Sequence, residues 1–328
     1  MLGRTAIVAN KPVVVVLHSD HLPEGMDAVS AVAEVRYATA ENLGDAVPGA
    51  DVLLLWDFFS PAVKQAWDRC DSLKWIHIAA AGVDSLMFDD LVESEVVVTN
   101  SRGIFDRPIA EFVLGTILAF AKDSAKSAEL QSRKIWTHRE TERIDTAHAL
   151  VFGTGAIGRE IARLLGAVGM SVSGVGRTAR TDDVDFGVVH ASSDLAGVVH
   201  DVDYLVLVAP LTDATRRVVN SDVLAAAKPG IRVINVGRGE LLDTEALLAH
   251  LGTGQVGAAA LDVFDEEPLP PDSPIWSTAN LVVTPHMSGD ALGWRRRLAD
   301  LFVANFQRYI ASEQLENVVD KKLGFIAS

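Results

Sequence analysis

The chain has 328 residues, about twice the usual length of one domain, so we expect two domains. Hydrophobic residues make up 49% of the sequence and charged residues 22%, which is typical of a globular protein and excludes a disordered or fibrous chain. The formal net charge of −15 opposes non-specific binding to nucleic acid or to an anionic membrane.

Cysteine content and apolar runs bear on the compartment. Cys70 is the one cysteine, so an internal disulfide is excluded, which is typical of a reducing cytosol. The apolar runs at residues 12–17 and 109–120 are too short to span a bilayer. We therefore expect a cytoplasmic protein without a membrane partner. We also expect no metal, because the sequence has no Cys/His cluster with ligand spacing.

Short β-branched runs alternate with helical patterns along the first hundred residues. Strands are predicted at residues 13–17, 34–37, 52–55, 74–78 and 96–98. Such continuous apolar runs are typical of strands that are buried on both faces of a parallel sheet. A helix is predicted at residues 61–69, where Ser60 suits the N-cap and Pro61 the first turn. The alternation predicts an α/β unit.

A second alternation begins at residue 147, after a long helical pattern over about residues 106–131. Six strands are predicted at residues 147–152, 170–175, 204–208, 233–236, 257–261 and 281–283. Helices such as 157–167 and 244–250 lie between them, and a final helix is expected at about residues 291–311. Six strands with crossing helices make a complete dinucleotide-binding sheet, so the fold class is α/β with two doubly wound parallel sheets.

A glycine-rich turn, Gly153-Thr154-Gly155-Ala156-Ile157-Gly158, stands between the first of these strands and its helix. The first glycine permits a tight turn, the second lets backbone amides approach a pyrophosphate, and the third lets the helix pack on the strand. The helix N-terminus then offers partial positive charge to the phosphates. A glycine pattern alone is only a turn, but this context predicts cofactor binding by Gly153, Gly155, Ala156, Ile157 and Gly158.

The end of the next strand bears on which cofactor is bound. An NAD-preferring site carries an acidic residue there for the ribose hydroxyls, whereas this sequence has Gly176-Arg177-Thr178-Ala179-Arg180. A guanidinium can hold the 2′-phosphate of NADP by charge-assisted hydrogen bonds. We therefore predict that Arg177, Thr178 and Arg180 contact this phosphate and that NADPH is preferred over NADH. The alternative is that both arginines are ordinary surface residues.

Five segments, in order along nearly the whole chain, resemble the NAD(P)-dependent D-isomer-specific 2-hydroxyacid dehydrogenases. They are the glycine turn and residues 80–84, 235–239, 261–270 and 284–289. Gly176-Arg177-Thr178 makes the resemblance closest to the NADP-using glyoxylate and hydroxypyruvate reductases. The resemblance implies a flavodoxin-like substrate domain of residues 1–100 plus 288–328. A Rossmann domain of residues 101–287 is then inserted between its two parts.

The resemblance also implies catalytic roles for Arg238, Glu267 and His286. Reduction of a 2-oxo acid needs a hydride and a proton for the developing alkoxide, and a histidine, with an ordinary pKa of about 6.5, suits that proton transfer. Glu267 would accept a hydrogen bond from the imidazole and favour its charged form. Arg238 would hold the substrate's carboxylate and polarise its carbonyl. Taken alone, Glu267 resembles part of an exposed acidic run and His286 an ordinary structural histidine.

Other residues are implied by the same resemblance. The backbone amides of Ala81, Gly82 and Val83 would contact the substrate carboxylate, although a simple tight turn explains these residues nearly as well. Trp56 stands in an aromatic run that we expect at the mouth of the pocket, and the roles of Asp290 and Trp294 stay open. Further cofactor contacts are implied for Pro210, Thr215, Val236 and Asp262.

These patterns predict an NADPH-preferring reductase of small 2-oxo acids. The alternative is a dinucleotide-sensing corepressor of the same fold, although such proteins usually carry Pro- or Ser-rich tails, which we do not find here. A homodimer is expected, because the apolar pattern at residues 108–120 exceeds what one domain surface needs to bury, and two-fold pairing is the commonest oligomer.

Overall fold

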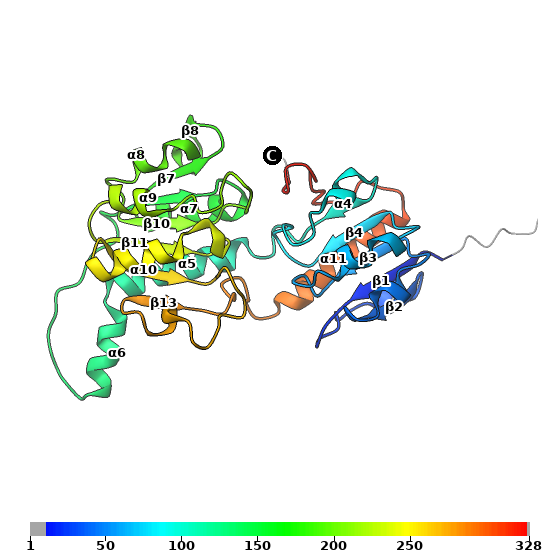
Figure 1. The fold of residues 1–328 in the computed structure, drawn as a ribbon, viewed down its shortest axis with the longest axis horizontal. Helices are drawn as coiled ribbons and strands as arrows, with labels where there is room; N and C mark the ends of the chain where they lie inside the picture. The colour runs from blue at the N-terminus through cyan, green and yellow to red at the C-terminus, as the bar shows by residue number, and fades with distance from the viewer. Residues whose placement is uncertain (1–10, 327–328) are drawn as a thin grey trace, which may run out of the picture. The chain divides into compact units, whose positions relative to one another are not determined.

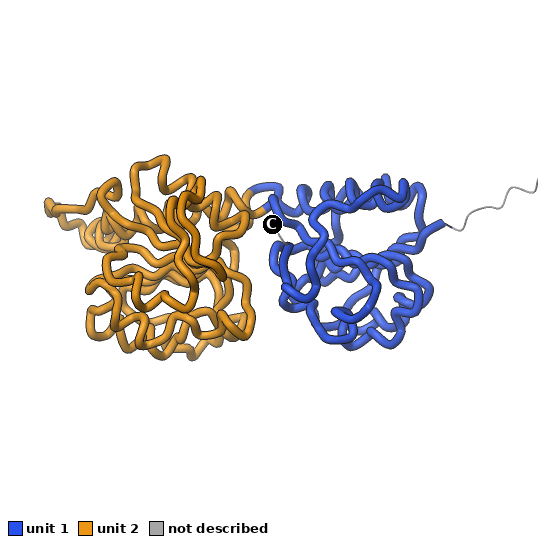
Figure 2. The backbone as a smooth tube through the Cα atoms, turned by 90° about the horizontal axis from the view of Figure 1, so that it is seen from above, with its two compact units in different colours: residues 1–104, 292–328 blue, residues 105–291 orange. Residues whose placement is uncertain are grey.

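The computed structural model describes residues 11–326 (Figure 1). The chain forms two compact units, residues 1–104 with 292–328, and residues 105–291. The described residues of the two units have different colours in Figure 2. The chain therefore passes from one unit to the other at residues 104–105 and again at 291–292. The sequence placed these boundaries at residues 100–101 and 287–288.

The first unit is a five-stranded, all-parallel sheet in the order β2-β1-β3-β4-β5. This is the flavodoxin-like order. The central strands β1, β3 and β4 are buried, and Phe302 of the last helix stacks on Trp75 at a centroid distance of 5.4 Å. The elements are β1 (Val13–Leu17), α1 (Asp27–Ser30), β2 (Glu34–Ala38), α2 (Leu43–Ala46), β3 (Val52–Leu55), α3 (Ala62–Gln65), η1 (Trp67–Arg69), β4 (Trp75–Ile78), α4 (Asp89–Glu93), β5 (Val97–Thr99) and α11 (Trp294–Ile310).

The second unit is built on an eight-stranded sheet in the order β13-β12-β11-β10-β6-β7-β9-β8. All neighbouring strands are parallel except β8 and β9, which form an antiparallel hairpin. Its strands are β6 (His148–Phe152), β7 (Ser171–Gly176), β8 (Arg180–Asp183), β9 (Gly187–Ala191), β10 (Tyr204–Leu207), β11 (Ile231–Asn235), β12 (Val256–Leu261) and β13 (Leu281–Val283). Its helices are α5 (Asp106–Ala121), α6 (Ser124–Ser132), α7 (Ala156–Ala167), η2 (Ser192–Asp194), α8 (Leu195–Val198), α9 (Ser221–Ala226), η3 (Gly239–Leu241), α10 (Thr244–Thr253) and η4 (Pro274–Ser277).

The predicted fold class, α/β with two doubly wound parallel sheets, is confirmed, with three local differences. The long helix expected at 106–131 is two helices, because Asp123 has a left-handed backbone (φ 50°) between α5 and α6. The helix expected at 61–69 is one turn of α3 followed by the 3₁₀ turn η1. The strands β8 and β9 were not predicted.

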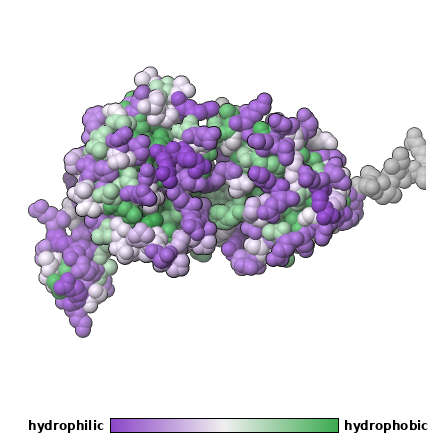
Figure 3. All heavy atoms as spheres, in the orientation of Figure 1, coloured by the Kyte–Doolittle hydropathy of each residue, from purple (hydrophilic) through white to green (hydrophobic). Residues whose placement is uncertain are grey.

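The surface agrees with the acidic composition. On the face shown in Figure 3, hydrophilic residues predominate and apolar residues form small patches between them. Among residues 11–326, no helix is both long enough and apolar enough to span a membrane.

Candidate active site

The glycine turn joins β6 to α7 with a close packing that only glycine permits. Gly153 has φ +124°, and a Cβ there would stand 2.7 Å from the backbone nitrogen of Ala209. A Cβ on Gly158 would stand 1.9 Å from the carbonyl oxygen of Gly153. At Gly155, by contrast, no other described group lies within 4 Å of the Cβ position. Strand and helix are therefore in contact, while the turn keeps an open side beside the N-terminus of α7, an arrangement that fits a dinucleotide pyrophosphate.

The end of β7 lies beside this turn. A Cβ on Gly176 would stand 3.0 Å from the hydroxyl oxygen of Thr154, so the last residue of β7 packs against the glycine turn. Arg177 and Thr178 then lead into β8, whose first residue is Arg180. Nε of Arg180 donates a hydrogen bond to Oδ2 of Asp183 at 2.8 Å. The three residues predicted to bind a 2′-phosphate thus lie close together in the chain, between the end of β7 and the start of β8.

Arg238 lies in a turn after β11 that is fixed by Asn235. The Asn235 amide donates to the carbonyl oxygen of Arg238 at 2.8 Å, and its oxygen accepts from the N–H of Gly237 at 3.1 Å. A Cβ on Gly239 would stand 2.0 Å from the carbonyl carbon of Phe264, so this turn packs directly against the segment after β12. Asn235 therefore orders the backbone that carries Arg238.

Glu267 and His286 meet directly, as the motifs predict. Nδ1 of His286 and Oε2 of Glu267 are 2.7 Å apart, and Oε1 of Glu267 accepts from the N–H of Phe264 at 2.9 Å. Burial alone would raise the pKa of the Glu267 carboxyl, but the hydrogen bonds from His286 and Phe264, together with the charge of Arg238, bring that pKa below its usual value. His286 and Arg238 therefore both act electrostatically on Glu267.

Asp262 holds the turn that carries His286. It is 1% exposed, and its Oδ1 accepts from the Thr284 hydroxyl at 2.5 Å and from the N–H of Met287 at 2.9 Å. Its Oδ2 accepts from the N–H of Ser288 at 2.9 Å, and its carbonyl oxygen accepts from the N–H of His286 at 2.8 Å. His286 has a left-handed backbone, φ 50°, a conformation that costs a non-glycine residue free energy unless its surroundings impose it. The sequence suggested a cofactor contact for Asp262 and missed this positioning role.

The remaining predicted cofactor residues lie after neighbouring strands. The Thr215 hydroxyl donates to the carbonyl oxygen of Pro210 at 2.8 Å, which closes the loop after β10. Val236 is buried after β11. Because β6, β10 and β11 are adjacent and parallel, their carboxyl ends share one edge of the sheet, where open α/β sheets bind ligands.

The predicted substrate loop belongs to the other unit, after β4. The Asn100 amide donates to the carbonyl oxygen of Ala81 at 2.6 Å, and the side chain of Val83 is buried. Gly82 lies between these two anchored residues. The assignment of this loop to a substrate carboxylate stays a prediction.

Comparison with known proteins identifies the family. Residues 114–288 match the family model described as the NAD binding domain of the D-isomer specific 2-hydroxyacid dehydrogenases. The chain belongs to this family. The dehydrogenase is therefore an oxidoreductase with an NAD-binding domain. Among residues 11–326 it has no group of three or more His, Cys, Asp or Glu side chains arranged to hold a metal ion.

Relatives of this dehydrogenase include glyoxylate reductases. A glyoxylate/hydroxypyruvate reductase A of Arabidopsis thaliana is 28% identical over 83% of each chain. A D-isomer specific 2-hydroxyacid dehydrogenase of Xanthobacter autotrophicus, solved with NADPH and MES, is 31% identical, with a TM-score of 0.79 over 97% of this chain and 100% of the other. An NADPH-dependent glyoxylate/hydroxypyruvate reductase of Sinorhizobium meliloti, solved with NADP and sulfate, is 26% identical, with a TM-score of 0.80 over 96% of this chain and 100% of the other.

Proposed function

We propose that this dehydrogenase reduces small 2-oxo acids of the glyoxylate and hydroxypyruvate type to D-2-hydroxy acids, with NADPH as the preferred hydride donor. The observation that carries the proposal is the 2.7 Å contact between His286 and Glu267, beside the turn that holds Arg238. A carboxylate paired with a histidine, next to an arginine, can bind an anionic carbonyl compound and protonate it. The glyoxylate reductases among the relatives support the substrate class.

Each residue has a separate task in this reaction. Arg238 binds the substrate carboxylate and polarises the neighbouring carbonyl oxygen, since a guanidinium stays charged at any working pH. The bond from Nδ1 of His286 to Glu267 fixes the ring, so Nε2 is the nitrogen that gives its proton to the developing alkoxide. Glu267 stabilises the positive charge of the imidazolium before that transfer. A nicotinamide dinucleotide bound along the glycine turn supplies the hydride.

The preference for NADPH rests on the connection between β7 and β8. No carboxylate stands at the end of β7 to bind the ribose hydroxyls or to repel a 2′-phosphate, and Arg177, Thr178 and Arg180 follow instead. Each charge-assisted hydrogen bond to such a phosphate contributes about 1.5–3 kcal/mol. Two related structures hold NADPH or NADP, which supports the same preference.

We also propose a homodimer that pairs through α5. Leu118 of this helix is 38% exposed, and Phe112, Leu114 and Phe120 are only partly buried. Light scattering at micromolar concentration would show twice the monomer mass, whereas a monomer mass would contradict this assembly.

Initial rates over a panel of 2-oxo acids, each with NADPH and with NADH, test the substrate class and the cofactor preference. His286→Ala should lower kcat about 10²- to 10⁴-fold without changing the Kd for NADPH, because it removes the proton donor alone. His200→Ala, a change at an exposed histidine after α8, is the matched control and should keep wild-type kcat. Wild-type kcat in His286→Ala would refute the mechanism.

Arg177→Ala tests the cofactor preference separately. Loss of one or two phosphate contacts should lower the NADPH-to-NADH ratio of kcat/KM by about tenfold to several hundredfold. A wild-type enzyme that prefers NADH, or an unchanged ratio in the variant, would show that the arginines are surface residues.

A further inference from the structure

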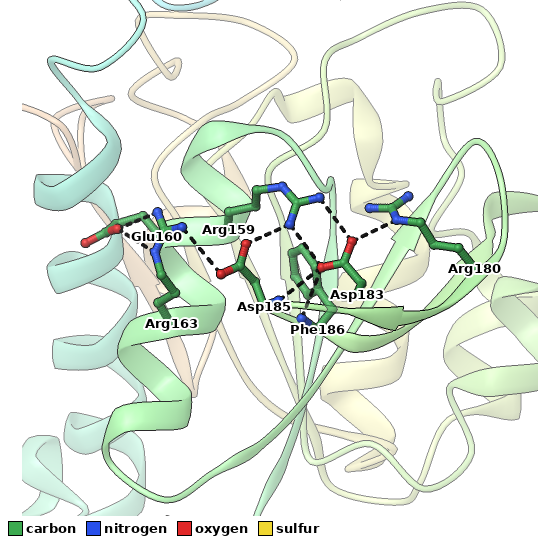
Figure 4. Close-up of polar contacts among 7 residues, drawn as sticks. All are labelled: Arg159, Glu160, Arg163, Arg180, Asp183, Asp185 and Phe186. Carbon is green, nitrogen blue, oxygen red and sulfur yellow. Dashed lines mark hydrogen bonds and ion pairs between the residues drawn. The ribbon is translucent and has the colours of Figure 1, made fainter. Parts of the chain in front are cut away.

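Five charged residues form an ion-pair cluster between α7 and the β8–β9 hairpin, which we call the hairpin cluster (Figure 4). At its centre, Asp183 is held by two arginines from different elements. Its Oδ1 accepts from Nη1 of Arg159 at 2.9 Å, and its Oδ2 accepts from Nη2 of the same guanidinium at 3.0 Å. Oδ2 also accepts from Nε of Arg180 at 2.8 Å. The cluster consists of Arg159, Arg163, Arg180, Asp183 and Asp185.

The second acid, Asp185, is about as buried as Asp183 but bonds to different arginines. The side chains of Asp183 and Asp185 are 5% and 8% exposed. Asp185 accepts from Arg159 at 2.6 Å and from Arg163 at 3.4 Å, both on α7. Asp183 therefore touches Arg180, whereas no contact of Asp185 in the cluster involves Arg180.

The cluster and the packing around it fix the hairpin to α7. Oδ1 of Asp183 also accepts from the backbone N–H groups of Asp185 and Phe186, at 3.1 and 3.4 Å. The Phe186 ring is buried, lies 5.7 Å from the Arg159 guanidinium and would be 3.0 Å from a Cβ on Gly174 in β7. One carboxyl group thus ties the hairpin backbone, α7 and the first residue of β8 together.

The bond to Asp183 sets the direction of the Arg180 guanidinium. It uses Nε, at the stem of the group, and Figure 4 draws no contact between Asp183 and the two terminal nitrogens of Arg180. The Arg180 side chain is 37% exposed, so this fork is accessible from solvent. A guanidinium whose stem is fixed loses less rotational freedom when it forms a bidentate bond to a phosphate.

Two arginines, Arg159 and Arg180, share the single negative charge of Asp183. Hydrogen bonding from Arg159 holds the pKa of Asp183 below its usual range, so Asp183 is ionised at neutral pH. Arg159 also bonds to Asp185 at 2.6 Å, and Arg163 bonds to Glu160 on its own helix at 2.8 Å and to Asp185 at 3.4 Å. Because Asp183 divides its charge between two guanidinium groups, it offsets the positive charge of Arg180 only in part while it orients that side chain.

We propose that Asp183 is a positioning residue for cofactor selectivity, which holds Arg180 so that its terminal nitrogens face the 2′-phosphate of NADPH. This rests on the proposed preference for NADPH. Selectivity for the phosphorylated dinucleotide then depends on a buried acid as well as on the arginines, and orientation outweighs the electrostatic repulsion between Asp183 and the phosphate.

The test is titration of NADPH and NADH into the purified enzyme, with Kd as the readout, so that it does not depend on turnover. Asp183→Asn should raise the Kd for NADPH about five- to thirtyfold and leave the Kd for NADH within about twofold. Asp185→Asn is the matched control, because it removes an equally buried charge from the same hairpin without touching Arg180. It should keep the wild-type ratio of the two Kd values.

The sign of the effect separates orientation from charge. Removing a negative charge would by simple electrostatics improve NADPH binding, so a lower Kd for NADPH in Asp183→Asn overturns the proposal. In an Arg180→Ala background, Asp183→Asn should add less than about twofold, and a further loss there would mean that Asp183 does not act through Arg180.

A second variant keeps the proposal testable if Asp183→Asn fails to fold. Arg180→Lys keeps the charge but loses the Nε donor and leaves the Arg159–Asp183 pair in place. It should raise the Kd for NADPH about as much as Asp183→Asn, and a wild-type Kd would overturn the proposal. If the wild type binds both cofactors equally, the proposed NADPH preference itself fails. If the wild type prefers NADPH and Asp183→Asn has the same Kd for NADPH, only the role of Asp183 is refuted.

Discussion

Replacing Asp262 by asparagine should slow catalysis without weakening cofactor binding. The substitution keeps the size of the side chain but turns one of two acceptor oxygens into a donor. Both oxygens are in use, Oδ1 by Thr284 and Met287 and Oδ2 by Ser288, so an amide group in either position faces a backbone N–H. Since Asp262 is 1% exposed, water cannot replace the lost bond.

The expected magnitude follows from the one bond that is lost. A hydrogen bond to a charged group contributes about 1.5–3 kcal/mol, and each 1.4 kcal/mol corresponds to about a factor of ten. If that free energy is expressed as displacement of the left-handed His286 turn, kcat should fall by about tenfold to slightly more than a hundredfold. This is smaller than the loss expected for His286→Ala, because the imidazole is still present but is misplaced.

The assay is kcat for 2-oxo acid reduction at saturating NADPH, together with the Kd for NADPH. Asp243→Asn is the control, because Asp243 caps α10 in the same unit by accepting from Ala246 at 3.1 Å. That change should leave kcat unchanged and the thermal midpoint nearly unchanged, because Asn caps a helix about as well as Asp. A folded Asp262→Asn with wild-type kcat refutes the positioning role, and a raised Kd with unchanged kcat would make Asp262 a cofactor contact instead.

Two further predictions concern pH. Glu267→Gln keeps an acceptor for His286 but removes the charge that favours the imidazolium, so kcat should fall about tenfold or more and the alkaline limb of the kcat/KM profile for reduction should move to lower pH; an unchanged profile would contradict the assigned role. Burial lowers the pKa of His77 to about 3. Below a pH of about 6.5 the unfolded chain therefore binds a proton that the folded chain does not. The free energy of unfolding should then drop by up to about 1.4 kcal/mol for each unit by which the pH falls. Urea unfolding at pH 7 and pH 5 should show a smaller drop for His77→Gln, and equal drops would refute this reasoning.

The central strands of both sheets could be predicted because burial on both faces leaves a continuous apolar run. In β3, for example, Val52–Leu55 is wholly buried, and its predicted bounds agree with the structure. The hairpin gave no such signal. Its first strand, Arg180–Asp183, lies at the sheet edge and has the sequence RTDD, which has no apolar residue. Its position depends on ion pairs with α7, such as that between Asp183 and Arg159, 24 residues earlier in the chain, and no local pattern encodes them.

The break between α5 and α6 was hidden for a different reason. Residues 121–125 contain neither glycine nor proline, so the helical pattern continues through them. The chain turns at Asp123, one of the few residue types that adopt a left-handed backbone with little strain. The tolerance of aspartate for this conformation permits a turn at Asp123 but does not predict one.

Motifs located the charged residues at the candidate site, but not the groups that hold them in place. The bond between His286 and Glu267 was expected from their positions in two motifs. The clamp by Asp262 could not be deduced, because its partners lie 22 to 26 positions away and two of the three are backbone amides, which leave no trace in a sequence. A buried acid just after a strand is the one local signal that could have suggested it.

Asp262 and Asp183 should act independently, because they stand far apart in the sheet. Asp262 follows β12 and Asp183 ends β8, which are six positions apart in the strand order. At a spacing of about 4.8 Å per strand, this puts them on the order of 25–30 Å apart, and their hydrogen-bond partners do not overlap. Substitutions at that distance are additive in free energy. The double variant Asp183→Asn/Asp262→Asn should therefore show the kcat of the second change and the NADPH Kd of the first. If the kcat or the NADPH Kd of the double variant differs from that of the corresponding single variant by more than about threefold, the two ends of the sheet are coupled.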